Sequence, residues 1–359
     1  MSDSPNILAW SASGDQGGGQ AWYDLCLTAD PNDENTVYVG GIRMKKSVDG
    51  GTTWLDIQNN YLHVDQHWLE FNPHNDVLFL ANDGGMYRYD NGTDWVDISD
   101  GIVTAQIYKL GQSPHSPVKT MCGFQDNGTS EFTGSVWSRR GGGDGFECAY
   151  DPTDDEWYFN SLYYGRIYRT GPNIQNQQIC GLDVLDVNEE GAWSAPYLLS
   201  RYDSNTLFSG LKNVWRSRNI KTPVFEDIVW EKISDNLGND NASNLNNLEE
   251  SRADSNMVWC SKGVRRIYLT TNALAPVEDV VWQDLSNNLP WLNLPVTAIE
   301  THPTDPSTLY IGFNSLVYKS TDMGETWEEW ETGLPGVAVN DILYDVMSDE
   351  GLYVGTDLG

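Results

Sequence analysis

The sequence predicts an all-β fold, and three observations support this prediction. Aromatic residues make up 12% of the 359 residues, whereas disordered chains contain few aromatic residues. Ala, Glu, Lys and Leu do not dominate as they do in helical bundles and coiled coils. Short β-rich runs recur at a spacing of roughly 40 to 50 residues, which is the range of propeller blades. Together these patterns predict a β-propeller of four-stranded blades.

Each repeated unit opens on a turn with Pro or Asp, and a short run rich in β-branched and aromatic residues follows. The clearest pairs are Asp30-Pro31 with residues 36–40, Asn72-Pro73 with 77–81, Asp151-Pro152 with 157–160, and Asp305-Pro306 with 308–312. A Trp marks the end of each unit: Trp54, Trp95, Trp137, Trp193, Trp230, Trp282 and Trp327. We expect the second strand of each unit after the turn and the fourth strand beside the Trp.

We expect a single propeller domain over residues 1–359, with seven complete blades, a partial eighth and almost no helix. The blades are expected near residues 20–60, 63–102, 103–142, 143–193, 194–240, 245–291, 294–337 and, for the partial one, 338–359. Residues 6–11 are a candidate strand that would close the ring beside residues 351–356. The alternative is that the chain is a fragment of a larger propeller, since it stops where a repeat should continue.

Two turns share the pattern S-x-D-x-G-x-T-W, at residues 47–54 and 320–327, and residues 90–95 keep D-x-G-x-x-W. In such a turn Asp bonds nearby backbone N–H groups, Gly takes a positive φ and Trp packs back over the turn. We therefore expect these residues to be structural and not catalytic. They are Ser47, Asp49, Gly51, Trp54, Asp90, Gly92, Trp95, Ser320, Asp322, Gly324 and Trp327.

This repeat resembles that of the Asp-box, or BNR-repeat, β-propellers. The chain is similar to bacterial sortilin-like (VPS10-type) proteins and to the glycosyl hydrolase-like family 74 xyloglucanases, and the resemblance covers nearly the whole chain. It implies the fold and not one function, because sialidases, xyloglucanases, sortilins and photosystem assembly factors share the repeat. The secreted members imply an extracellular or cell-surface location, after removal of a signal that this segment does not contain. A cytoplasmic location stays open.

The composition describes an acidic protein, with 52 Asp and Glu against 21 Lys and Arg and a formal net charge of −31. Such a chain repels nucleic acid and anionic lipid, and it has no apolar stretch long enough for membrane insertion. Asp is expected mainly in turns, the alternative being a surface adapted to a saline environment. The five cysteines show no CxxC pattern, so buried free thiols are expected.

The candidate site lies on one face of the predicted propeller. Connections between the second and third strands, and from one blade to the next, emerge on the same face, where such scaffolds bind ligands. The candidate ligand-binding residues on this face are Trp22, Tyr23, His63, Asp65, His67, Gln125 and Asn127. The candidate catalytic residues are Asp83, Asp126, Asp144 and Glu147. The H-x-D-x-H pattern at residues 63–67 is either half of a metal site or a strand entry whose histidines bond the backbone.

Two functions compete for this face. A glycoside hydrolase needs two carboxylates across a sugar-binding cleft, and the resemblance of residues 82–90 to the family 74 catalytic string implies Asp83 as a base. Carbohydrate binding without catalysis uses the same loops for a polysaccharide or glycan. The alternative is a non-catalytic, sortilin-like propeller for a protein or peptide ligand. The clustered oxygens would then form a recognition surface or a calcium site. The metal is otherwise unknown, and no other cofactor is indicated.

Overall fold

The computed structural model describes residues 4–90, 92–103, 105–182, 184–240, 242–290, 293–330, 333–348 and 350–359. Their regular structure is β-strand apart from short 3₁₀ helices of three residues each, so the expectation of an all-β fold with almost no helix is confirmed. No helix within these ranges has the length and apolar character needed to cross a membrane. The chain divides into two compact units, Met1–Gln106 and Ile107–Gly359, which are described separately.

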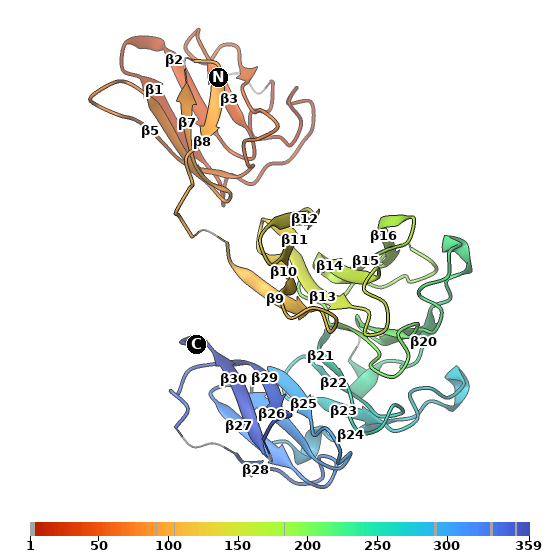
Figure 1. The fold of residues 1–359 in the computed structure, drawn as a ribbon. Coiled ribbons are helices and arrows are strands. Elements are labelled where there is room, and N and C mark those ends of the chain that lie inside the picture. The colour runs from red at the N-terminus through yellow and green to blue at the C-terminus, as the bar shows by residue number, and fades with distance from the viewer. Residues whose placement is uncertain are drawn as a thin grey trace. The chain divides into compact units, whose positions relative to one another are not determined.

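The first unit contains two four-stranded antiparallel sheets, in which sequential strands pair with one another (Figure 1). The first sheet is formed by β1 (Cys26–Asp30), β2 (Asp33–Gly40), β3 (Met44–Ser47) and β4 (Leu55–Asp56). The second is formed by β5 (Gln66–Phe71), β6 (Leu78–Asn82), β7 (Gly85–Asp90) and β8 (Asp94–Asp97). Strand β5 contacts β1 and β2, so the two sheets meet at the first strand of the second one.

The second unit continues the same plan with five four-stranded sheets and one hairpin among its described residues. The strands are β9 (Ile107–Gln112), β10 (Lys119–Phe124), β11 (Gly128–Thr133), β12 (Trp137–Gly141); β13 (Gly145–Tyr150), β14 (Tyr158–Leu162), β15 (Arg166–Gly171), β16 (Ile174–Cys180); β17 (Tyr197–Leu199), β18 (Leu207–Gly210), β19 (Val214–Ser217), β20 (Glu231–Lys232); β21 (Leu245–Glu250), β22 (Val258–Lys262), β23 (Ile267–Thr270), β24 (Trp282–Asp284); β25 (Ala298–Thr301), β26 (Leu309–Phe313), β27 (Leu316–Ser320), β28 (Glu328–Glu329); β29 (Val339–Asp345) and β30 (Gly351–Thr356). The 3₁₀ helices are η1 (Tyr163–Gly165), η2 (Phe225–Asp227), η3 (Leu237–Asn239), η4 (Val277–Asp279) and η5 (Ser286–Asn288).

These sheets are the predicted blades, and the fold class is confirmed: a β-propeller with seven complete blades and a partial eighth. In the second unit the first strands β9, β13, β17, β21, β25 and β29 contact one another in succession, so they form the inner wall of the stacked blades. The strands predicted after the Pro/Asp turns fall on β2, β6, β14 and β26. Residues 6–11, the candidate closing strand, form a turn and bends in the first unit and not a strand. The single domain and the closure of the ring stay predictions.

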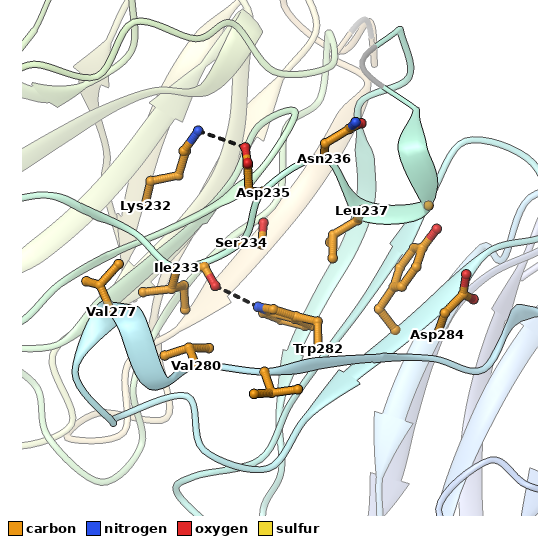
Figure 2. A pocket seen from close by; sticks show the side chains of 13 residues that line it. Lys232, Ile233, Ser234, Asp235, Asn236, Leu237, Val277, Val280, Trp282 and Asp284 are labelled. Carbon is orange, nitrogen blue, oxygen red and sulfur yellow. Dashed lines mark hydrogen bonds and ion pairs between the residues drawn. The ribbon is translucent and has the colours of Figure 1, made fainter.

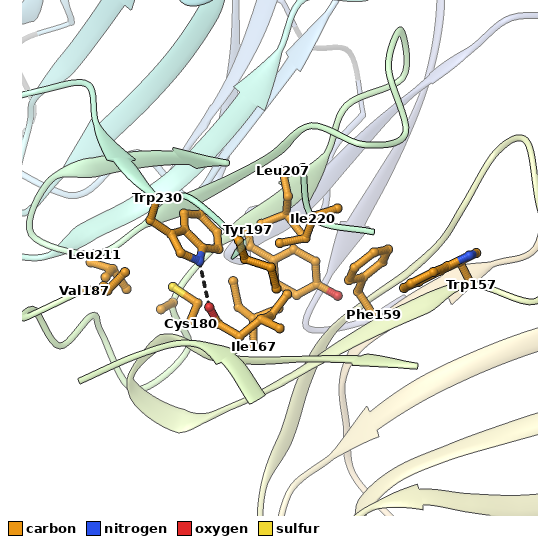
Figure 3. Packing of buried hydrophobic residues seen from close by; sticks show 13 residues of the cluster. Trp157, Phe159, Ile167, Cys180, Val187, Tyr197, Leu207, Leu211, Ile220 and Trp230 are labelled. Carbon is orange, nitrogen blue, oxygen red and sulfur yellow. Dashed lines mark hydrogen bonds between the residues drawn. The ribbon is translucent and has the colours of Figure 1, made fainter. Parts of the chain in front are cut away.

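The hydrophobic core lies between neighbouring blades and not in one central mass. One cluster joins the blade of β13–β16 to the blade of β17–β20 through Phe159 and Ile167 on one side and Leu207 and Trp230 on the other. Figure 3 shows these side chains interleaved between the two sheets. Each blade therefore depends on its neighbours to cover its apolar faces. The five cysteines are all free thiols; four of them are buried and Cys26 is partly exposed.

Three marker Trp residues form hydrogen bonds that link their blade to the preceding one. The indole N–H of Trp95 donates to the carbonyl of Ile57 at 3.0 Å, that of Trp230 to Ile179 at 2.7 Å and that of Trp282 to Ile233 at 2.8 Å; these three isoleucines lie in, or directly after, the outer strand of the preceding blade. The marker assignment of Trp193 is wrong. The fourth strand of its blade ends at Cys180, and Trp193 lies in the connection to the next blade.

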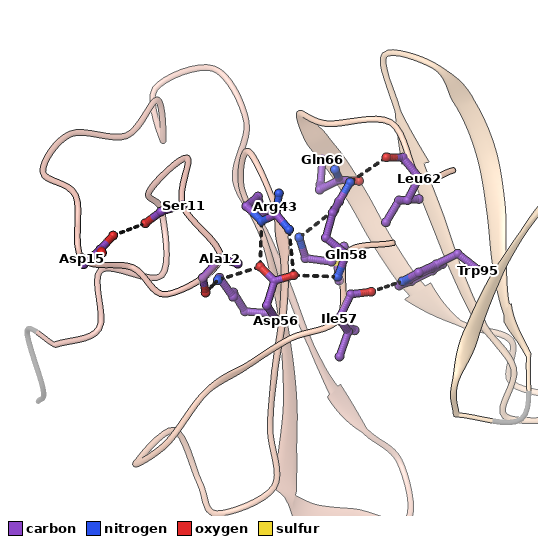
Figure 4. Close-up of polar contacts among 12 residues, drawn as sticks. Ser11, Ala12, Asp15, Arg43, Asp56, Ile57, Gln58, Leu62, Gln66 and Trp95 are labelled. Atoms are coloured by element: carbon purple, nitrogen blue, oxygen red, sulfur yellow. Dashed lines mark hydrogen bonds and ion pairs between the residues drawn. The ribbon is translucent and has the colours of Figure 1, made fainter. Parts of the chain in front are cut away.

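The first blade also holds the N-terminal segment. Asp56 of β4 accepts two hydrogen bonds from the Arg43 guanidinium, at 2.7 and 2.9 Å, and one from Lys45 Nζ at 2.8 Å. Lys45 is only 3% exposed and also donates to the carbonyl of Ala12. Figure 4 shows these groups converging on Asp56. The buried ammonium is thereby satisfied, and the segment before β1 is tied to the sheet.

The two S-x-D-x-G-x-T-W turns have the same hydrogen bonds. Ser320 Oγ donates to Asp322 Oδ1 at 2.8 Å and accepts the Gly324 N–H at 2.8 Å, while the Thr326 N–H and hydroxyl donate to the two Asp322 oxygens at 2.8 and 2.6 Å. The turn at Asp49 repeats this set, and its hydrogen bonds, the Thr53 hydroxyl first, lower the pKa of Asp49 to about 2. The Asp49 carboxylate thus accepts hydrogen bonds from residues of its own turn.

Two further turns use Asn in the same way, which the sequence pattern missed. Asn219 Oδ1 accepts the Val229 N–H at 3.0 Å, and Asn272 Oδ1 accepts the Val281 N–H at 3.0 Å. Their loops are longer and include η2 and η4, so the fixed spacing to Gly and Trp is lost. The turn at Asp90 is held differently, because its carboxylate takes two hydrogen bonds from Arg88; Asn91 lies outside the described residues.

The Asp322→Ala variant should lose stability and keep ligand binding. It removes the acceptor for the Thr326 N–H and hydroxyl, but both groups reach solvent, so we expect a loss of about 1 kcal/mol in the free energy of unfolding. Urea unfolding followed by Trp fluorescence measures this loss. Unchanged stability together with lost ligand binding would contradict the structural assignment of the turn.

Candidate functional site

The predicted site residues fall into one group in each unit. Trp22, Tyr23, His63, Asp65, His67 and Asp83 belong to the first unit, and Gln125, Asp126, Asn127, Asp144 and Glu147 belong to the second. Most of these residues lie in the turns before the first strand of a blade or between its second and third strands, whereas His67 and Glu147 lie within the first strands β5 and β13. The local geometry of each group decides what its side chains can do.

In the first unit, four predicted residues form what we call the Tyr23 cluster: Trp22, Tyr23, His67 and Asp83. The Tyr23 hydroxyl donates to Asp83 Oδ2 at 3.0 Å, and His67 Nε2 lies 2.7 Å from Asp83 Oδ1. The rings of Tyr23 and His67 pack edge to face at 5.0 Å, and Trp22 lies 5.9 Å from Tyr23. Trp22 is 86% exposed. The cluster thus presents an open aromatic face beside a carboxylate whose two oxygens are both held.

Asp65 and His63 support the loops behind this cluster. Gln20 Nε2 donates to Asp65 and to Asp24 Oδ2, and Asp24 is fully buried. Burial raises the pKa of Asp24, and Gln20 and Asp65 oppose this by hydrogen bonding. The backbone carbonyl of His63 accepts the side-chain amides of Gln66 at 2.7 Å, Asn82 at 3.0 Å and Gln58 at 3.2 Å. Within the described ranges no group of three or more His, Cys, Asp or Glu is arranged to hold a metal.

In the second unit, Asp126 and Asp144 hold two loops against each other. The Asp126 N–H donates to Asp144 Oδ1 at 3.0 Å, and the Gly128 N–H donates to the Gly143 carbonyl at 2.7 Å. Gly128 has φ +69°, and a Cβ there would overlap the Gly141 carbonyl. Asn127 donates to the Gln125 carbonyl from both its backbone at 2.7 Å and its side chain at 3.2 Å. The glycines here allow backbone to approach backbone, and these polar groups shape the turn.

Glu147 lies on the inner strand β13 and faces a lysine from the neighbouring inner strand. Its Oε1 is 3.4 Å from Lys109 Nζ of β9. Burial raises the pKa of Glu147, while Lys109 opposes this shift and Asp341 adds to it. A carboxyl with a raised pKa occurs in acid–base sites and also in structural ion-pair networks. Here the inner wall continues with further charged pairs, which favours the network.

These further pairs were not predicted from the sequence. On the inner strands β21 and β25, Glu249 pairs with Arg201 at 2.6 Å and Glu300 with Arg252 at 2.8 Å. The Tyr344 N–H also donates to Glu300 at 3.1 Å. Burial, with Glu300 and Glu250 nearby, raises the pKa of Glu249 to about 8 although Arg201 favours the charged form. Single Glu residues in β-rich runs carry no pattern that reveals such a wall.

The Glu249→Gln variant should gain stability relative to the wild type as the pH rises. A carboxyl whose pKa is higher in the folded than in the unfolded state makes the protein less stable as pH rises from about 4.5 to about 8. Gln does not titrate, so the difference should grow by at least about 1.4 kcal/mol, the equivalent of one pKa unit, between pH 5 and pH 8. Urea unfolding at both pH values measures it, with Glu328→Gln on the exposed β28 as control. A difference that stays constant with pH would contradict this assignment.

An aromatic group lies on the connections of the β13–β16 blade. Tyr163 stacks on Trp193 at 5.2 Å with an interplanar angle of 9°, and Arg166 lies 4.9 Å above Tyr163. Tyr164 has φ +64°, an unusual conformation for a bulky residue. Its backbone bonds hold it there: the Tyr164 N–H donates to the Trp193 carbonyl at 3.3 Å and its carbonyl accepts the Gly191 N–H at 3.1 Å. Trp193 is 44% exposed, so this group is a second aromatic surface.

Comparison with known proteins places the chain by structure and not by sequence. No family model matches it, and no curated protein matches it. PorZ, a surface component of the type-IX secretion system of Porphyromonas gingivalis, has a TM-score of 0.50 at 10% identity, with 90% of this chain and 55% of that chain covered. YCF48 from Cyanidioschyzon merolae has a TM-score of 0.49 at 12% identity, with 93% of each chain covered. The GH74 xyloglucanase from Xanthomonas campestris has a TM-score of 0.32 at 14% identity, with 93% of this chain and 57% of that chain covered. All three are β-propellers, and the likeness to PorZ shows the fold alone.

Proposed function

We propose that this protein is a carbohydrate-binding β-propeller of the Asp-box type, and that the Tyr23 cluster contacts the sugar. The observation that supports this most is the exposed indole of Trp22 beside Tyr23 and Asp83. A sugar ring needs an apolar face to stack on and a polar group for its hydroxyls, and ligand sites generally combine aromatic walls with few fixed polar groups. Tyr23 and His67 hold the Asp83 carboxylate in place, so the polar part of the cluster is already ordered before a ligand arrives.

Binding is favoured over hydrolysis by the state of the candidate catalytic carboxylates. A glycosidase requires an acid and a second carboxylate that face the glycosidic bond. Asp144 accepts the Asp126 N–H and Glu147 pairs with Lys109, so both already serve structural contacts. We include an extracellular or cell-surface location in this proposal, because that is where the protein would encounter polysaccharides. A strongly acidic chain is expected to favour neutral over anionic polysaccharides.

Affinity electrophoresis of the full chain against soluble polysaccharides tests this proposal. The panel contains xyloglucan, mixed-linkage β-glucan, arabinoxylan and galactomannan as neutral polymers, with polygalacturonate as the anionic comparison. We expect retardation by at least one neutral polymer and no release of reducing ends on long incubation. Reducing-end release would support the hydrolase alternative. If none of the polymers retards the protein, carbohydrate binding is contradicted and a protein or peptide ligand is favoured instead.

A further inference from the structure

Two carboxyl groups are buried next to each other behind the Tyr23 cluster. Asp24 is fully buried and Asp65 is only 8% exposed. The side-chain amide of Gln20 donates to both of them, to Asp24 Oδ2 at 3.1 Å and to Asp65 Oδ1. The two carboxyl side chains are also hydrogen-bonded to each other. Because ionised carboxylates only accept hydrogen bonds, this bond requires a proton on one of the two groups.

The charged and titratable groups around the pair favour one proton over full ionisation. His67 of β5 is the cationic group that favours a charged Asp24, but burial has the larger effect and raises the pKa of Asp24. His67 is moreover paired with Asp83 at 2.7 Å. Burial also raises the pKa of the Cys26 thiol on β1 to about 12, so this neighbour stays uncharged near neutral pH. Two carboxylates that share one buried site titrate as a pair, and the first proton is held tightly.

The pair joins the two segments that carry the ring side chains of the Tyr23 cluster. On one side, Gln20 binds both carboxyl groups through its amide, and its backbone carbonyl accepts the Tyr23 N–H at 2.7 Å. On the other side, Asp65 lies directly before β5, which carries His67. The bond between Asp24 and Asp65 therefore holds the positions of Tyr23 and His67 relative to each other.

We propose that Asp24 and Asp65 share one proton, and that loss of this proton weakens ligand binding at the Tyr23 cluster. At acidic pH the O–H of one carboxyl group donates to the other and keeps the two segments together. When the proton leaves, two buried negative charges repel each other and loosen the contact. The effect on binding rests on the proposed carbohydrate function, whereas the shared proton itself does not.

The pH dependence of the Tm of the full chain tests the shared proton, with Asp24→Asn as the variant. The Asn amide donates to Asp65 at every pH, and its oxygen still accepts from Gln20. An Asp whose pKa is higher in the folded than in the unfolded state makes the protein less stable as pH rises above about 4. Between pH 5 and pH 8 the Tm of the wild type should therefore fall relative to that of Asp24→Asn, by about 2 °C. Asp65→Asn should act alike, since Asn tolerates the φ of +65° at this position.

Affinity electrophoresis at pH 5 and pH 8 tests the effect on binding, with the neutral polymers named above. One proton changes an affinity by at most about tenfold per pH unit. We expect the ratio of the affinities at pH 5 and pH 8 to be about tenfold larger for the wild type than for Asp24→Asn. The titration of His67 is common to both proteins and cancels in this comparison. If no polymer retards the protein at either pH, the proposed function fails and the regulation of binding fails with it, while the Tm still decides on the shared proton.

Asp235→Asn is the control for the same substitution at an exposed carboxylate. Asp235 lies after β20, its side chain is 84% exposed, and it pairs with Lys232 at 3.1 Å (Figure 2). Its loss should leave the pH dependence of the Tm unchanged. An equal pH dependence in the wild type and in Asp24→Asn would overturn the shared proton. A changed Tm profile with an unchanged affinity ratio would overturn the regulation of binding. Stabilisation of the wild type by calcium at pH 8, absent in Asp24→Asn, would assign the pair to a cation instead.

Discussion

The Arg216→Met variant should lose about 3–5 kcal/mol of unfolding free energy, the range found when one partner of a buried charged network is removed. Arg216 of β19 is fully buried. Its guanidinium donates to Glu231 at 2.9 and 2.7 Å and to the carbonyls of Ala273 and Ala275 in the next blade. Met has a similar length but no donor, so two carbonyls and part of a carboxylate are left without their bonds. Urea unfolding followed by Trp fluorescence measures the loss.

Arg218 provides the control for this variant. It pairs with the same Glu231 at 3.1 Å, but its side chain is 47% exposed. An exposed ion pair contributes roughly 0–1 kcal/mol, so Arg218→Met should be nearly neutral. Equal losses in the two variants would mean that the pairing with Glu231, and not the bonds to the next blade, determines the effect of Arg216.

A buried arginine that donates to carbonyls of the next blade also occurs one blade earlier, and this shows how blades are joined. Arg169 of β15 is fully buried and donates to the carbonyls of Ile220 and Thr222 at 2.6 and 2.7 Å. In both blades an Arg on the third strand reaches the turn that follows the third strand of the next blade. The Trp indoles form hydrogen bonds to the preceding blade, and these arginines form hydrogen bonds to the next one. Because hydrogen bonds are directional, they set the relative orientation of neighbouring sheets, which apolar burial alone does not do.

The blade repeat could be predicted from the sequence because it depends on local chemistry. A Pro/Asp turn, a β-rich run and the S-x-D-x-G-x-T-W turn each act within about ten residues, so the pattern and the bonds coincide at Asp49 and Asp322. Asn219 and Asn272 escaped because a longer loop separates them from the groups that they bond. Trp193 was misassigned because spacing alone does not distinguish a fourth strand from a connection.

The candidate sites were predictable only in part, since they depend on contacts between distant segments. His67 and Asp83 could be placed on one face from their positions in one blade, and they do meet. The role of Asp144 as acceptor for the Asp126 N–H depends on how two loops pack. The charged inner wall at Glu249 and Glu300 combines residues about 50 positions apart in the blade repeat. No periodicity in the sequence reports on such pairs.

Trp22→Ala should weaken binding of the retarding polysaccharide by roughly 30-fold, equivalent to about 2 kcal/mol, as for an aromatic anchor at the centre of a contact. The exposed indole makes few contacts within the unit, so stability should hardly change. Asp83→Asn keeps the shape of the side chain but removes the charge that Tyr23 and His67 orient, and a smaller loss of about tenfold is expected. Affinity electrophoresis over a range of polymer concentrations measures both, with Tm as the check on folding. Trp10→Ala is the control, because Trp10 is 57% exposed in the same unit but lies outside the Tyr23 cluster. If Trp10→Ala weakens binding and Trp22→Ala does not, the sugar contacts another face and the Tyr23 cluster is structural.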